Sequence, residues 1–171
     1  KNLVVPLQGK KTFNFVDDHY SKGDKVLDFG CGIGSNSKLF HHDDYIGVEV
    51  DESRVLSSRL KYPKSKFEKI PFISTSDDKI PFEDNSFDLV FISLCLHHID
   101  SDTCKLLFKE FSRVLKGSGK IIGIEPCILS EKYFSNIFMN IIDAGDYILP
   151  IEEYKQIYSS EAFQVKDINI V

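Results

Sequence analysis

Short apolar runs alternate with helical patterns along the chain, which is typical of a parallel sheet assembled from βαβ units. Most of these runs are apolar at successive positions, as expected for central strands that helices cover on both faces. The last run alternates apolar and polar residues, as a half-buried strand near a sheet edge does. The predicted strands are Lys25–Phe29, Tyr45–Glu49, Phe67–Ser74, Ser86–Ser93, Lys120–Glu125 and Phe163–Val171.

The segments between these runs carry apolar residues at helical spacing. Ser101 is a candidate N-cap for the clearest stripe, and the glycines at 117–119 are expected to end that helix. Apolar stripes or short helical patterns cover Ser35–His41, Asp51–Leu60, Cys104–Leu115 and Phe134–Ile142. The whole pattern predicts a doubly wound, mostly parallel α/β sheet with helices on both faces. A ligand of such a sheet lies beyond the carboxyl ends of the strands, at a switch point in strand order.

Composition supports one ordinary domain. The 171 residues are 42% hydrophobic and 27% charged, with a formal net charge of −5. The acidic total lacks the basic footprint of a nucleic-acid binder. No apolar run approaches the roughly 20 residues that span a bilayer, so we expect no membrane insertion.

The four cysteines, Cys31, Cys95, Cys104 and Cys127, form no CxxC pair and show no regular spacing. This argues against a disulfide framework and against structural zinc. We therefore expect a reducing compartment and a cytoplasmic protein. Because the chain does not begin with Met, we expect its ends not to be the natural ones.

The loop after the first predicted strand has glycines at alternating positions, Gly30, Gly32 and Gly34. Such glycines let the backbone turn sharply and approach a ligand closely. A dinucleotide-binding loop would carry its third glycine at position 35, where this chain has Ser35. The GxGxG pattern therefore disfavours pyrophosphate and makes an NAD-dependent oxidoreductase a distant alternative.

Two acidic residues flank this loop. Asp28 at the strand tip would repel a pyrophosphate and attract an ammonium or sulfonium group. Glu49 ends the second strand, about 20 residues after the glycines, where a carboxylate can accept both hydroxyls of a ribose. In this order the residues describe a site for a nucleoside that bears an amino acid. The plain alternative is a glycine-rich turn with a capping aspartate.

Residues 26–34 (VLDFGCGIG) resemble the first motif of class I S-adenosylmethionine-dependent methyltransferases. Further segments resemble that family in the same order along the chain, at 46–49, 80–90, 94–99 and 113–119. The resemblance implies S-adenosyl-L-methionine as cofactor, with S-adenosyl-L-homocysteine as product. It also implies a Rossmann-like sheet with strand order 3-2-1-4-5-7-6 and an antiparallel seventh strand. Because this chain stops at an apparent sixth strand, we expect a missing last strand or a differently built edge.

The resemblance implies one domain over 1–171, with a helical segment at 1–22, a cofactor-binding core at 23–126 and acceptor-side helices with an edge strand at 127–171. Asp28 would orient the cofactor's amino group, Glu49 would hold the ribose and Val50 would pack on adenine. Ser93 would offer its backbone to the methionine ammonium group. The full set of cofactor-binding residues that it implies is Asp28, Phe29, Gly30, Cys31, Gly32, Glu49, Val50, Ser76, Asp77 and Ser93.

Two assignments carry alternatives. The family's spacing places the adenine contact at Ser76, but its neighbour Asp77 has the expected acidic side chain, so we favour Asp77 and keep Ser76 as the alternative. His97 and His98 follow the fourth strand, and either is a candidate catalytic base for an acceptor that must lose a proton. The structural alternative is that His97 caps or packs while His98 lines the cofactor pocket.

We expect no metal site. The stretch His41–Asp44 (HHDD) resembles a metal cluster but is predicted to be a surface loop opposite the cleft. Acceptor selection is expected from the aromatic-rich segments Leu7–Tyr20 and Pro126–Tyr158, with Asp17, Asp18, His19 and Glu125 as further polar groups.

The sequence thus predicts a methyltransferase acting on a small molecule, because a partly apolar pocket follows more readily than a nucleic-acid groove. The alternatives are an RNA or protein methyltransferase and a non-catalytic S-adenosylmethionine-binding partner subunit.

Overall fold

A computed structural model describes residues 2–5, 15–126, 147–159 and 163–168. Its centre is a seven-stranded sheet in the order β4-β3-β2-β5-β6-β1-β7, with all neighbouring strands parallel. The strands are β1 Asn2–Val5, β2 Val26–Phe29, β3 Tyr45–Glu49, β4 Lys66–Lys69, β5 Phe87–Ser93, β6 Leu115–Ile124 and β7 Gln164–Ile168. The helices are the 3-10 helices η1 Ser35–Leu39 and η2 Leu96–His98 and the α-helices α2 Glu52–Lys61, α3 Ser101–Val114 and α5 Ile151–Tyr158.

The predicted doubly wound α/β fold is confirmed. The first five predicted strands correspond to β2, β3, β4, β5 and β6, and they lie in the expected order 3-2-1-4-5. The third is shorter than expected, because β4 ends at Lys69, before Pro71. The predicted stripe at Phe134–Ile142 lies outside the described residues.

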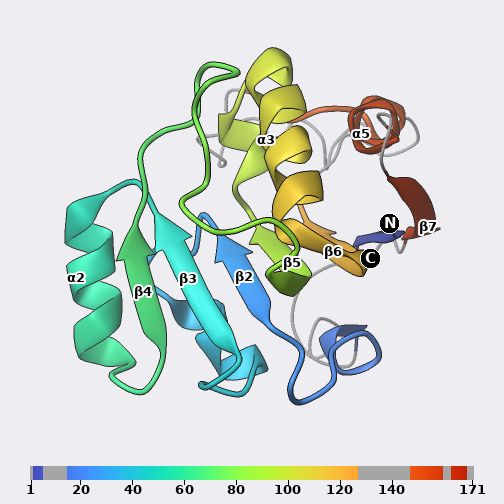
Figure 1. The fold of residues 1–171 in the computed structure, drawn as a ribbon. Helices are drawn as coiled ribbons and strands as arrows, with labels where there is room; N and C mark the ends of the chain where they lie inside the picture. Colours follow the sequence, from blue (N-terminus) through green and yellow to red (C-terminus); the bar gives the residue numbers. More distant parts are fainter. Residues whose placement is uncertain (1, 6–14, 127–146, 160–162, 169–171) are drawn as a thin grey trace, which may run out of the picture.

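The far edge of the sheet differs from the prediction. β1 lies between β6 and β7 and is parallel to both, in the place expected for an antiparallel seventh strand (Figure 1). The expectation of a helical segment over 1–22 is therefore wrong for residues 2–5, whereas residues 15–17 are helical. The apolar run at residues 3–5 is too short for periodicity to distinguish a strand from a helix.

Side-chain caps fix the starts of the two longest helices. The Asp51 carboxylate accepts hydrogen bonds from the amides of Ser53 and Arg54 at the start of α2. Asp100 does the same for α3, so Asp100 is the N-cap and the prediction of Ser101 is wrong by one residue. The expected helix end at 117–119 is also wrong, because α3 ends at Val114 and β6 begins at Leu115.

Two apolar clusters cover the two faces of the sheet. Successive β2 residues alternate between them, since Val26 joins one cluster and Leu27 and Phe29 join the other. α3 covers the face that carries Leu27 and Phe29, where the Phe111 ring packs edge to face against Phe29 with 5.0 Å between centroids. This packing fixes α3 beside the carboxyl ends of β2 and β5, where the predicted site lies (Figure 1).

The paired position of β1 gives a testable prediction. Leu3 pairs with Ile121 of β6 on one side and Val165 of β7 on the other. We expect Leu3→Pro to lower the free energy of unfolding by at least about 2 kcal/mol relative to Leu3→Ala, because proline removes a ladder hydrogen bond that alanine keeps. Urea unfolding of both variants measures the difference, and equal stabilities would contradict the pairing.

Candidate functional site

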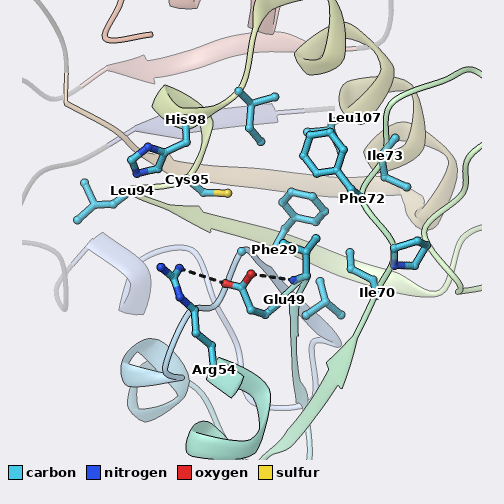
Figure 2. A pocket seen from close by; sticks show the side chains of 15 residues that line it. Phe29, Glu49, Arg54, Ile70, Phe72, Ile73, Leu94, Cys95, His98 and Leu107 are labelled. Carbon is cyan, nitrogen blue, oxygen red and sulfur yellow. Dashed lines mark hydrogen bonds and ion pairs between the residues drawn. The ribbon is translucent and has the colours of Figure 1, made fainter. Parts of the chain in front are cut away.

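A cavity of about 330 Å³ opens at the carboxyl ends of β2, β3 and β5 (Figure 2). Its volume lies in the range typical of small-molecule sites. Its walls are mainly apolar, and charged or titratable side chains reach it from β3, α2 and η2. The lining residues are Phe29, Gly30, Val48, Glu49, Val50, Arg54, Ile70, Pro71, Phe72, Ile73, Leu94, Cys95, His98, Ile99 and Leu107.

Gly30 shapes one wall of the cavity. Its φ of 70° lies in the left-handed region, and a Cβ atom there would come within 2.3 Å of the Cys95 Sγ atom. The amides of Gly30 and Cys31 both donate to the carbonyl oxygen of Val48, at 2.9 and 3.0 Å. The loop therefore approaches β3 and the β5–η2 junction closely only because position 30 lacks a side chain.

Glu49 links the end of β3 to the glycine loop. One carboxylate oxygen accepts the amides of Val50 and Asp51 at 2.7 and 3.2 Å, and the other accepts the amide of Gly32 at 3.1 Å. Arg54 of α2 brings its guanidinium within 3.8 Å of the second oxygen (Figure 2). These contacts hold the carboxylate at the cavity wall, so its oxygens form the acidic end of an otherwise apolar cavity.

Asp28 lies on the other face of the sheet from its neighbour Phe29, which lines the cavity. Asp28 is fully buried, and the phenol of Tyr45 donates to its Oδ2 atom at 2.6 Å. Burial raises the pKa of Asp28 to about 7, the hydrogen bond from Tyr45 opposes this rise, and the nearby Glu49 charge adds to it. Among the described residues, nothing hydrogen-bonds to the Asp28 Oδ1 atom.

The loop after β4 forms the opposite wall of the cavity. Ile70, Phe72 and Ile73 line it, whereas Ser76 and Asp77 are exposed and lie outside the lining. Asp78 holds the following turn, because its carboxylate accepts the amides of Ser74 and Thr75 at 2.9 and 2.8 Å. The loop thus offers apolar side chains to a nucleobase. The sequence interpretation missed these side chains because it assigned this run to a strand.

Leu94 directly follows β5 with a φ of 52°, a left-handed conformation that is uncommon for a leucine. Its amide donates to the Ile124 carbonyl oxygen at 2.7 Å, and its side chain is half exposed at the cavity. Ser93, the predicted backbone contact, is partly buried and lies outside the lining. Strained backbone of this kind concentrates at functional sites.

Glu125 and His97 form a buried pair behind the cavity. One Glu125 oxygen accepts the amides of Cys95 and Leu96 at 2.9 and 2.8 Å, and the other lies 2.7 Å from the His97 Nδ1 atom. The His97 ring is buried, whereas His98 is exposed and lines the cavity, with 4.1 Å between the two ring centroids. Glu125 therefore holds the backbone of the β5–η2 junction, and of the two histidines His98 is the one that reaches the cavity.

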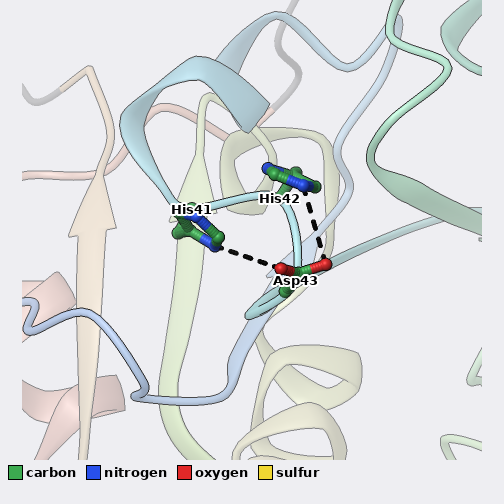
Figure 3. A group of neighbouring side chains, drawn as sticks. All are labelled: His41, His42 and Asp43. Carbon is green, nitrogen blue, oxygen red and sulfur yellow. Dashed lines mark ion pairs between the residues drawn. The ribbon is translucent and has the colours of Figure 1, made fainter.

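The other polar candidates lie apart from this cavity. His41 Nδ1 and His42 Nε2 contact different oxygens of the Asp43 carboxylate, at 3.7 and 3.6 Å (Figure 3). The two imidazole rings stack with 29° between their planes, and their ligand atoms lie within 4.8 Å of one another and of the Asp43 carboxylate. His19 lies near the amino end of the sheet, where its carbonyl oxygen accepts from the Lys120 ammonium group.

The close approach at Gly30 predicts a specific loss of stability. We expect Gly30→Ala to cost about 2 kcal/mol or more, because the new Cβ atom meets the Cys95 sulfur and the left-handed backbone is strained for alanine. Gly117→Ala is the matched control, since its Cβ atom would meet nothing within 4 Å. Thermal and urea unfolding compare the two. The added variant Cys95→Ala should restore part of the loss, and equal costs at positions 30 and 117 would refute the contact.

Comparisons with known proteins agree with this geometry. An uncharacterised protein of Methanocaldococcus jannaschii is 29% identical over 84% of this chain and 60% of its own length. A demethylmenaquinone methyltransferase of Staphylococcus saprophyticus is 28% identical over 72% of this chain and 55% of its own length. The chain thus spans little more than half the length of these curated relatives.

Among solved structures, geranyl diphosphate C-methyltransferase from Streptomyces coelicolor has the same fold. It superposes with a TM-score of 0.62 at 20% identity, over 85% of this chain and 56% of its own, and its structure contains S-adenosyl-L-homocysteine. The profile of the methyltransferase domain family matches residues 27–123, which include the glycine loop, Glu49 and both histidines of η2. The chain therefore belongs to the S-adenosylmethionine-dependent methyltransferase family, with the class I fold.

Proposed function

We propose that this protein transfers a methyl group from S-adenosyl-L-methionine to a small-molecule acceptor. The observation that carries the proposal is the position of Glu49. It lies at the wall of an apolar cavity, bonded to the glycine loop, at the carboxyl ends of the strands that the family profile matches. In an open parallel sheet this edge is where ligands bind.

The residues around the cavity fit the cofactor. Gly30 provides a wall without a side chain, against which an extended aliphatic group can lie. Glu49 offers carboxylate oxygens to a pair of hydroxyls, and Val50 with Phe72 offers apolar surface to a base. When bound, the cofactor supplies a methyl group that its sulfonium already activates, so positioning and exclusion of water are the protein's main tasks.

Asp28, Gly32, Cys31 and Ser93 lie behind or beside the cavity and outside its lining. We keep them in the proposed site as the support of its inner wall, Asp28 acting as a buried carboxyl group and Ser93 through its backbone. Asp77, or Ser76 in its place, would need the loop after β4 to move inward before it could meet an adenine, whereas Phe72 already lies at the cavity. We therefore assign the contact with the adenine ring to Val50 and Phe72.

We assign the role of catalytic base to His98, for an acceptor that must lose a proton. Its ring reaches the cavity, and its backbone is held by η2, whose amino end Glu125 caps. His97 lies too deep to touch a substrate and acts through the loop that it shares with His98. An imidazole suits this role because it exchanges protons near neutral pH.

A small, largely apolar acceptor is favoured over RNA or protein. The relatives include enzymes named for demethylmenaquinone and geranyl diphosphate, and the formal net charge of −5 opposes RNA binding. No helix within residues 2–5, 15–126, 147–159 and 163–168 is long and apolar enough to cross a membrane. We place the protein in the cytoplasm because Cys31, Cys95 and Cys104 are free thiols, as a reducing compartment maintains them.

Cofactor binding is tested by thermal unfolding in the presence of S-adenosylmethionine, S-adenosylhomocysteine or NAD. We expect the first two to raise the melting temperature by mass action and NAD to leave it unchanged. Glu49→Gln should remove most of the rise, whereas Glu52→Gln, which changes an exposed carboxylate at the start of α2, should keep it. Stabilisation by NAD alone would overturn the proposed function.

The acceptor and its base are tested together. Incubation with small-molecule extracts and S-adenosylmethionine, followed by mass spectrometry, should reveal a product heavier by one methyl group. With a hydroxyl acceptor found in this way, His98→Gln should slow transfer by about 10² to 10⁴-fold and leave S-adenosylhomocysteine affinity within a factor of two. His42→Gln, on the far loop, is the control and should retain full activity. Retained activity of the His98 variant would remove that residue from the mechanism, and cofactor binding without any methylated product would favour a non-catalytic partner subunit.

A further inference from the structure

The buried pair of Asp28 and Tyr45 is more elaborate than a glycine-loop scaffold requires. The phenol donates to the Oδ2 atom at 2.6 Å, and the Asp28 side chain is completely buried. The Oδ1 atom, equally buried, has no hydrogen-bond partner among the described residues. A buried carboxylate with one free oxygen is costly, which points to a purpose beyond packing.

Gly47 makes the contact of Tyr45 with Asp28 possible. Tyr45 and Gly47 are two positions apart on β3 and so face the same side, and Gly47 is the register partner of Asp28. A Cβ atom at position 47 would come within 2.7 Å of the Tyr45 hydroxyl oxygen and 2.9 Å of the Cys31 Sγ atom. The phenol therefore passes over the gap that Gly47 leaves in order to reach the carboxylate.

The groups around Asp28 favour its neutral form before a ligand binds. Burial and the charge of Glu49 raise the pKa of Asp28 to about 7, and the Tyr45 hydrogen bond lowers it from what burial alone would give. Burial raises the pKa values of the Cys31 and Cys95 thiols, and the nearby Asp28 carboxylate adds to the rise at both. Cys95 lines the cavity, so the charge of Asp28 acts at the cavity wall although the carboxylate is not part of that wall.

We propose that Tyr45 is a positioning residue that holds the Asp28 carboxylate behind the glycine loop, and that binding of the cationic cofactor releases the proton of Asp28. This inference rests on the proposed function, because it needs a ligand whose cationic groups enter the cavity. The balance is one proton lost from the Asp28 carboxyl group to solvent for each cofactor bound, with no covalent bond to the ligand. A cation near a buried carboxyl group favours the ionised form, and the linkage is reciprocal.

The direction of the pH dependence follows. Below pH 7 the carboxyl group is mostly protonated in the free protein, so binding must first remove a proton and the Kd rises by up to about tenfold per pH unit. Well above pH 7 the group is already ionised, so this contribution to the Kd becomes flat. Affinity for the cofactor therefore increases as the pH rises through 7.

Isothermal titration calorimetry of S-adenosylmethionine into the whole chain, from pH 6 to pH 9, tests this coupling directly. Titrations in two buffers of different ionisation enthalpy count the protons released. We expect the count to approach one near pH 6 and to fall toward zero at pH 9. Asp28→Asn, which cannot ionise, should bind without this pH dependence.

Tyr45→Phe tests the phenol. Because the variant loses a hydrogen bond to the charged carboxylate, the pH at which the affinity increases should be higher by about one to two units. At pH 7 the variant should bind about five- to fiftyfold more weakly than the wild type, and at pH 9 within about twofold of it. Tyr20→Phe is the matched control, since the Tyr20 phenol donates to Asp44 at 2.8 Å, away from the cavity lining, and should change neither the Kd nor its pH profile.

Each outcome decides a different point. Tight binding by the wild type with a flat pH profile overturns this inference and leaves the proposed function standing. A pH slope that persists in Asp28→Asn assigns the proton to another group and also overturns the inference. A Tyr45→Phe affinity that is equally weak at pH 7 and pH 9 reduces the phenol to a packing role. Wild-type protein that binds no S-adenosylmethionine at any pH overturns the proposed function and this inference with it.

Discussion

The site depends on the close approach of the glycine loop to the two strands beside it. The amides of Gly30 and Cys31 share one carbonyl oxygen at the end of β3, and Gly30 lies directly against Cys95 after β5. A side chain at position 30 would separate these elements and fill the cavity wall. Gly30 is thus a packing requirement, because its lack of a side chain sets the distance between the strand ends that form the cavity.

Three buried carboxylates then hold the surrounding loops, each with a different set of partners. Glu49 accepts amides from both the glycine loop and the start of α2, and Glu125 accepts amides of the β5–η2 junction. Asp28 receives a phenol instead, and its other oxygen has no hydrogen-bond partner within the part of the chain that the structure describes. Backbone amides thus occupy the Glu49 and Glu125 carboxylates, whereas burial raises the pKa of Asp28 to about 7.

The sequence predicted the cofactor half of the fold well, because its motifs correspond to local constraints that the structure makes visible. Arg113, from the last motif, donates to the carbonyl oxygens of Ile80 and Phe82 in an earlier one. Lys116 likewise pairs with Asp88. Motifs distant in the chain are therefore parts of one hydrogen-bonded unit, whereas the apolar runs between them predicted strands β2 to β6.

Other features could not be predicted because they depend on tertiary contacts. The division between His97 and His98 follows from burial, which two adjacent identical residues do not reveal. The apolar wall at Ile70–Ile73 looked like part of a strand, because a short apolar run has the same composition in either role. The use of Tyr45 as a partner for Asp28 requires the register of β2 against β3, which pairing and not periodicity determines.

The edge of the sheet shows why the cavity tolerates a change of topology. β1 completes the sheet from the amino-terminal end of the chain, parallel to β6 and β7, where the family pattern implies an antiparallel strand. Among the described residues, the cavity is lined from β2, β3, α2, the loop after β4, the β5–η2 junction, η2 and α3, and none of these lining residues comes from β1, β6 or β7. This edge of the sheet supports the site by covering the flank of β6. The last residue of β6, Ile124, and the following Glu125 both accept hydrogen bonds from the β5–η2 junction. Any strand that protects β6 from solvent and fixes its end satisfies this need, whichever direction it runs and whichever end of the chain supplies it. The described walls of the cavity therefore belong to the part of the chain that the family profile matches, and β1 and β7 at the far edge contribute only to the flank of β6.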